Sequence, residues 1–213
     1  MKSLVQYIYE AIKKLPESVS GLIVFDIDDT LLKVKADGIR VYKKDPKTGK
    51  ETALTTDEFA KDPDVITHHE WFDFRDFQNE VKVYNSIIEG TPLIKNLKIM
   101  DAYIRAGYHF CFLTARGCED TVKKALKDFL RYRDEDGNLV ELADIFKETL
   151  SHAINDRFKD YPGKTDAEKK ANVLKDLCKK YDRVIFVDDD KKNIRYANSL
   201  ELDNLKVIKA WDD

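Results

Sequence analysis

Three short apolar runs, each followed at once by polar residues, dominate the hydrophobic pattern of the chain. They occupy residues 22–25, 108–113 and 184–187. Their β-branched and aromatic residues are typical of buried strands. After each run, apolar residues recur every three or four positions, which predicts helices. Because strands and helices alternate, the sequence predicts an α/β fold, a Rossmann-like three-layer sandwich with a mostly parallel sheet.

The same pattern predicts the remaining elements. One helix is expected to start at Thr91-Pro92 and to end at Gly107. Further helices are expected over residues 119–130, 165–181 and 194–200, and an amphipathic helix over residues 4–15. Weaker strand signals lie at residues 145–154 and 205–210.

A β-hairpin is predicted in the insertion between the first two strong strands. Residues 39–42 and 52–55 flank the turn-forming sequence from Asp45 to Gly49. Behind it follow four aromatic residues, which we interpret as packing under the hairpin rather than as a platform for a base. They are Trp71, Phe72, Phe74 and Phe77.

Carboxylates crowd the end of the first strand, where Asp26, Asp28 and Asp29 follow residues 22–25. Such a cluster is unfavourable unless a cation lies among the carboxylates or one of them stays protonated. Alternation along an extended chain places Asp26 and Asp28 on one side and Asp29 on the other. We therefore expect a metal site that carries chemistry, although Asp29 or Thr30 can also simply cap a helix.

The other two strands end in similar chemistry. Thr114 and Arg116 follow residues 108–113 directly before a helix start, where an anion can bind, and Arg116 can grip a phosphate with two hydrogen bonds. Alternatively, Thr114 closes a turn and Arg116 is a surface charge. Asp188 and Asp189 follow residues 184–187. Open α/β sheets bind ligands at the carboxyl ends of their strands, so these groups are expected to meet there.

With these residues in place, the chain resembles the haloacid dehalogenase (HAD) superfamily of phosphohydrolases, from about residue 21 to its end. The insertion is not covered by the resemblance. The first motif is similar to Asp26-Ile27-Asp28-Asp29-Thr30, the second to Thr114 and the fourth to Asp188-Asp189. The third motif is a lysine, to be chosen among Lys164, Lys169 and Lys170.

The resemblance implies a mechanism. Asp26 would be the nucleophile and Asp28 the general acid and base. Mg²⁺ would be held by Asp26, by the backbone carbonyl of Asp28 and by Asp188, with Asp189 nearby. Thr114 and the N–H groups after it would hold the phosphoryl oxygens, and the lysine would stabilise the charge that develops in the transition state. An acid at position 28 favours a phosphatase, or less often a phosphomutase, over the ATPase and dehalogenase branches.

Helical phase selects the lysine. Val173, Leu174 and Leu177 form the apolar stripe of the helix expected over residues 165–181. Lys170 lies three, four and seven positions before them and shares their face. Lys169 shares it less squarely, and Lys164 precedes the helix. We therefore choose Lys170, with Lys169 as the rival.

The resemblance also gives the insertion a role. The expected organisation is a single HAD-like hydrolase domain over residues 1–213, in which residues 33–90 form a flap or small cap that selects the substrate. Residues 33–50 carry seven lysines and arginines. A phosphorylated small molecule, a nucleotide or a nucleic-acid end is therefore the expected substrate, and Tyr42 can stack a base. Alternatively, the hairpin is only solvated, or the chain is a nucleic-acid-binding or regulatory module with little catalysis.

Composition limits the other classes. The net charge of −3 argues against a protein that coats nucleic acid through bulk charge. The three cysteines lack metal-binding spacing, and we interpret them as reduced thiols of a cytoplasmic protein. No membrane span or secretory signal is expected. The sequence is silent on oligomeric state.

Overall fold

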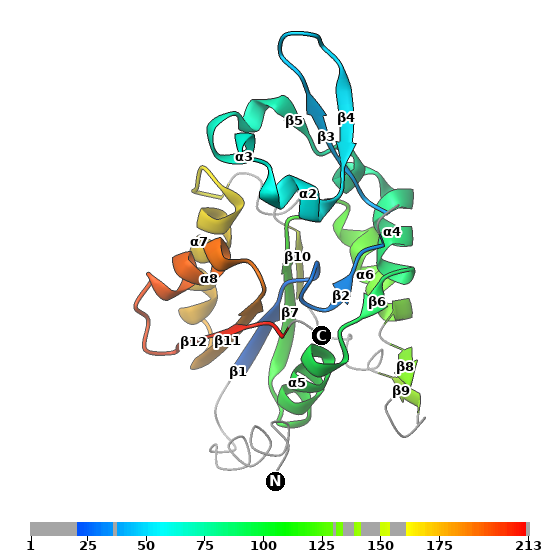
Figure 1. Cartoon of the computed structure of the whole chain (residues 1–213). Helices are drawn as coiled ribbons and strands as arrows, with labels where there is room; N and C mark the ends of the chain where they lie inside the picture. Colours follow the sequence, from blue (N-terminus) through cyan, green and yellow to red (C-terminus); the bar gives the residue numbers. More distant parts are fainter. Residues whose placement is uncertain are drawn as a thin grey trace.

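A five-stranded parallel sheet forms the centre of the computed structural model, which describes residues 21–35, 38–129, 131–133, 139–141, 150–153 and 161–211. The strand order is β10-β7-β1-β11-β12, and all four pairings are parallel (Figure 1). The strands are β1 (Gly21–Phe25), β7 (His109–Thr114), β10 (Leu150–Ala153), β11 (Arg183–Asp188) and β12 (Leu205–Lys209). The three strongly apolar strands are therefore confirmed, and they lie side by side.

Helices cover both faces of this sheet. Side chains alternate along each strand, so Ile23 and Phe25 pack into one core while Leu22 and Val24 pack into the other. The first core lies under α4 (Glu80–Ile88), α5 (Ile94–Arg105) and α6 (Glu119–Phe129). The second lies under α7 (Asp166–Cys178) and α8 (Lys191–Asn198). This confirms a parallel α/β sheet flanked by helices, an arrangement compatible with a Rossmann-like fold.

None of the helices within the described ranges has the length and apolar character that crossing a bilayer requires.

One helix start differs from the prediction. Thr91 and Pro92 form the short strand β6 (Thr91–Pro92), which pairs antiparallel with β2 (Leu32–Lys33), and α5 begins only at Ile94. The backbone N–H of Leu93 donates to Leu31 at 2.9 Å, which continues this pairing. Pro92 fits because a proline is tolerated in an edge strand. The helix expected over residues 4–15 lies outside the described residues.

Residues 38–79 form the central part of the predicted insertion 33–90, and this part, called the insertion from here on, stands over the carboxyl ends of the central strands (Figure 1). The predicted hairpin is present as β3 (Val41–Lys44) and β4 (Glu51–Leu54), and β5 (Phe72–Asp73) extends it to three antiparallel strands. Its turn is fixed because the Asp45 carboxylate accepts from the N–H groups of Lys47 and Thr48, while Gly49 adopts a φ of +70°. The other short elements are α2 (Thr56–Lys61), α3 (Asp64–Thr67), η1 (His69–Trp71) and η2 (Arg75–Gln78). A separate hairpin, β8 (Arg131–Arg133) with β9 (Leu139–Glu141), follows α6.

Aromatic packing holds the insertion together, as predicted for this segment. Phe59 of α2 meets Phe72 and Phe74 edge to face, with ring centroids 5.2 and 5.3 Å apart. Tyr42 is also engaged internally, because the Arg75 guanidinium covers its ring at 3.8 Å. The ammonium of Lys43 is bound by the carboxylates of neighbouring helices. Tyr42 and Lys43 of the hairpin thus contribute to contacts within the insertion.

The buried carboxylate of Asp76 joins the insertion to α4. It is 4% exposed and accepts from Arg40 N at 3.1 Å, Tyr42 Oη at 3.2 Å and Lys82 Nζ at 2.8 Å. We expect Asp76→Ala to lower the free energy of unfolding by about 1.5–3 kcal/mol, since hydrogen bonds to a charged group are lost. Lys82→Ala is the matched control: its side chain is 44% exposed, so about 0–1 kcal/mol is expected. Urea denaturation measures both, and an equal loss in the two variants would contradict this account.

Candidate active site

The ends of three neighbouring strands bring the predicted residues to one edge of the sheet. Phe25 pairs with Phe112 of β7 and with Val187 of β11. Asp26 continues β1 by one position, and its N–H donates to Val187 at 3.0 Å. Thr114 is the last residue of β7 and Asp188 the last residue of β11. The parallel register therefore places these side chains at a common edge.

Three carboxylates gather at this edge. Oxygen atoms of Asp26, Asp188 and Asp189 lie within 4.8 Å of one another, and no other group of this kind occurs in the described part of the chain. Asp26 and Asp188 are buried and Asp189 is half-buried, and an all-oxygen donor set of this kind suits Mg²⁺. The carboxylate of Asp28 is not in this group, and the predicted ligation by its backbone carbonyl stays a prediction.

Lys170 lies between two of these carboxylates. Its Nζ donates to Asp26 Oδ1 at 2.6 Å and to Asp188 Oδ2 at 2.9 Å, and the residue is only 3% exposed. Of the three candidate lysines, Lys164 is exposed and Lys169 half-buried. Helical phase explains the difference, because Lys170 shares the buried face of α7 with Val173 and Leu174.

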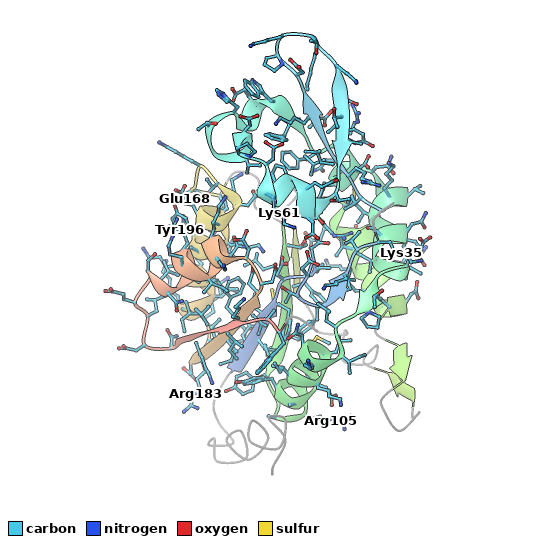
Figure 2. All side chains as sticks on the ribbon, viewed as in Figure 1. Lys35, Lys61, Arg105, Glu168, Arg183 and Tyr196 are labelled. Atoms are coloured by element: carbon cyan, nitrogen blue, oxygen red, sulfur yellow. The ribbon has the colours of Figure 1, made fainter. Side chains whose placement is uncertain are left out.

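The first turn of α7 is fixed against α8. Figure 2 shows Glu168 of α7 and Tyr196 of α8 side by side, and the Tyr196 hydroxyl donates to Glu168 at 3.1 Å. Glu168 also accepts from the N–H of Lys164, while the Thr165 hydroxyl caps the helix. These contacts hold the turn that carries Lys170.

Negative charge exceeds positive charge in this cluster. Burial raises the pKa of Asp26 well above its usual value; Lys170 opposes this, while the like charge of Asp188 adds to it. Burial also raises the pKa of Asp189 to about 7, helped by Asp188 and Asp29. For Lys170, burial lowers the pKa but the carboxylates of Asp188 and Asp26 outweigh it and raise the pKa overall. One ammonium does not balance three carboxylates, so a divalent cation fits the site.

Further polar groups orient the carboxylates. Asn193 Nδ2 donates to Asp188 Oδ1 and Oδ2 at 3.1 and 3.0 Å, and the N–H of Asp190 donates to Asp188 at 2.9 Å. The Thr30 hydroxyl donates to Asp189 Oδ1 at 3.1 Å. Sequence reasoning missed Asn193; its place in the first turn of the helix after Asp188-Asp189 is the signal that points to it.

Arg116 is paired with Asp28. Its Nε donates to Asp28 Oδ2 at 2.9 Å and its Nη2 to Oδ1 at 2.6 Å. The Arg116 side chain is completely buried, so the alternative of a surface charge is wrong: α4 covers it, and Ser86 and Val83 accept from its Nη1. Contact of Arg116 with a substrate phosphate stays a prediction.

The Thr114 loop is closed by the insertion. The buried Thr114 hydroxyl accepts from the N–H of Arg116 at 3.2 Å, and the N–H of Gly117 donates to Phe77 at 2.9 Å. A Cβ at position 117 would meet the end of the Gln78 side chain, so a larger residue here would have to displace that side chain. Contact of Thr114 with a phosphoryl group is likewise still a prediction.

A pocket of about 460 Å³ opens between the insertion and the segment after β1, and of the three carboxylates Asp189 lines it. Its volume lies within the range of small-molecule sites. Asp29 and Asp189 line the pocket next to the strand ends. Lys33 and Lys35 line it from the segment after β1, and Thr56 lines it from the start of α2.

The raised pKa of Asp189 predicts a pH-dependent effect of Asp189→Asn in metal-free protein. A carboxyl whose pKa rises from about 4 in the unfolded chain to about 7 on folding stabilises the fold below pH 4. This contribution is lost as the pH rises toward 7. Asparagine does not ionise, so Asp189→Asn should gain thermal stability over wild type at pH 8 and lose that gain at pH 4. Melting curves in EDTA measure this; a difference independent of pH would contradict it.

No protein-family model matches the sequence, and no curated protein matches it either. The resemblance to the HAD superfamily therefore rests on the residues themselves.

Proposed function

We propose that the chain is a Mg²⁺-dependent phosphomonoesterase that acts through an aspartyl-phosphate intermediate. The observation that carries the proposal is the buried contact of Lys170 with Asp26 and Asp188, at the carboxyl edge of the parallel sheet. This chemistry requires a nucleophilic carboxylate, a lysine ammonium held in place, and further carboxylates that bind a metal.

In the first step, an oxygen of Asp26 attacks the phosphorus of the substrate and forms a new P–O bond. The bond between phosphorus and the ester oxygen breaks, and its electron pair stays on the leaving oxygen. Asp28 enters this step in its protonated form, gives its proton to that oxygen, and the oxygen departs as an alcohol. Lys170 and Thr114 stabilise the negative charge on the phosphoryl oxygens.

In the second step, water attacks the phosphorus of the aspartyl-phosphate. The water gives a proton to Asp28, and the bond from phosphorus to the Asp26 oxygen breaks. Inorganic phosphate leaves, and both aspartates return to their starting states.

Mg²⁺ would be held by Asp26 and Asp188, with Asp189 close enough to join directly or through water. When bound, it neutralises charge between the carboxylate nucleophile and the anionic phosphate. The excess of carboxylates over ammonium groups described above supports this assignment.

The proposed substrate is a phosphorylated small molecule, a nucleotide or a nucleic-acid end. The insertion acts as a flap over the strand ends, and the pocket of about 460 Å³ that Asp189 lines offers space for part of a substrate. Binding of nucleic acid through the hairpin alone has weaker support, because Tyr42 and Lys43 are already engaged within the insertion.

The test is phosphate release from a panel of esters in Mg²⁺ and in EDTA. The panel contains p-nitrophenyl phosphate, nucleoside monophosphates, and 3′- and 5′-phosphorylated oligonucleotides. Metal-dependent release supports the proposal, and the best substrate gives its class. Correctly folded protein that releases no phosphate from any ester, yet binds oligonucleotides, would favour the binding module.

A further inference from the structure

Arg116 makes hydrogen bonds on two sides, with Asp28 of the candidate active site and with helix α4. Toward the candidate active site it forms the two hydrogen bonds with Asp28, at 2.9 and 2.6 Å. Away from the site its Nη1 donates to Ser86 Oγ at 2.6 Å and to the carbonyl oxygen of Val83 at 3.3 Å. The planar guanidinium fixes its partners in a fork, so the orientation of the Asp28 carboxylate depends on where Arg116 is anchored.

The anchor is rigid. Ser86 is 3% exposed, and its hydroxyl donates to Val83 at 2.9 Å, so the oxygen that accepts from Arg116 has a fixed orientation. Helix α4 is in turn held by Lys82, which bonds to Asp76 of the insertion, and by Tyr84, whose hydroxyl donates to Asp128 of α6 at 2.8 Å.

We propose that Arg116 and Ser86 are positioning residues for Asp28: the Ser86 hydroxyl fixes the guanidinium, and the guanidinium fixes the carboxylate that serves the leaving oxygen. This inference rests on the proposed function. Neither residue needs to touch the substrate, since Arg116 is fully buried and its guanidinium donates hydrogen bonds to Asp28 and to Ser86 of α4. The Asp28 side chain itself remains 23% exposed and open to a substrate.

The experiment compares two esters that differ in their need for an acid. An alkyl phosphate must have its leaving oxygen protonated, whereas the phenolate of p-nitrophenyl phosphate departs without that help. The value of kcat/KM reports the first step alone, up to departure of the alcohol. We expect Ser86→Ala to lower it about 10-fold or more for the alkyl ester and less than about threefold for the aryl ester. Arg116→Lys keeps the charge but not the fork, so the same selective loss is expected, at about 100-fold.

Ser199→Ala is the matched control. The Ser199 hydroxyl makes the same backward bond, to the carbonyl oxygen of Tyr196 at 2.7 Å, but Ser199 is exposed and directly follows α8. Its kcat/KM values should equal those of wild type. In an Asp28→Asn background, Ser86→Ala should have no further effect on the alkyl ester, because the two substitutions act through the same group.

Two results would overturn the inference: an equal loss on both esters, or no loss on either. If wild type hydrolyses neither ester, the proposed function is wrong, and the positioning role is then tested by a separate melting experiment. If Ser86, Arg116 and Asp28 form one unit, Ser86→Ala must lower the melting temperature less in Asp28→Asn than in wild type. Additive shifts would then overturn the positioning role.

Discussion

Asp26→Asn is expected to lower phosphate release by about 10⁴-fold or more, because an amide oxygen cannot replace the attacking carboxylate. Asparagine has nearly the same shape and can still accept the hydrogen bond that Lys170 donates to Asp26 at 2.6 Å. The fold should therefore survive, and the loss should appear in kcat. Initial rates with the best ester of the panel, measured at saturating Mg²⁺, provide the measurement.

Asp182→Asn is a suitable control for this experiment. Asp182 is exposed and lies directly before β11. The substitution removes the same negative charge as Asp26→Asn but lies outside the site. Its rate should match wild type. A full rate in Asp26→Asn would show that Asp26 is not the nucleophile, whatever the other residues do.

Lys170→Ala should be the most destabilising single change in the site. Without its ammonium, Asp26 and Asp188 face each other in a buried place with no cation. Removing one partner of a buried ion pair costs about 3–5 kcal/mol of unfolding free energy, and we expect this loss at pH 8 in EDTA. Mg²⁺ should restore part of it, since a ligand that binds only the folded state at 100 times its Kd contributes about 2.7 kcal/mol.

Lys169→Ala separates the two neighbouring lysines. It removes the same charge from the same helix but should change stability by less than about 1 kcal/mol, because Lys169 is half-buried outside the carboxylate group. Urea denaturation with and without Mg²⁺ distinguishes the variants. If Lys169→Ala were the more damaging change, the assignment of Lys170 would be wrong.

The parts of the site that sequence reasoning could reach are those fixed by local rules. Asp26, Thr114 and Asp188 end apolar strands, and parallel pairing brings such ends together without further information. Lys170 follows from helical phase, which decides between adjacent lysines. The sheet and most helices follow from the same two periodicities.

Pairings between distant segments were beyond that reasoning. Arg116 looks like a phosphate ligand in its own loop, and only the position of α4 shows that it is buried against Ser86 and Asp28. Thr91 and Pro92 look like a helix start, but the partner strand that holds them, β2, lies at Leu32–Lys33. Tyr42 looks free for a base until Arg75 is placed on its ring. Each case depends on a contact between residues at least 30 positions apart in sequence, where no local periodicity applies.

The position of β1 in the middle of the sheet has a consequence for how the chain reaches its native state. β1 is made before both of its neighbours, β7 and β11, and Asp26 meets Lys170 across 144 positions of sequence. Closing such distant contacts slows folding, and one edge of β1 stays unpaired until β11 has been translated. We expect a chain that stops after β7 to expose this apolar edge and to aggregate, so that the candidate site and the folded state arise in the same late event.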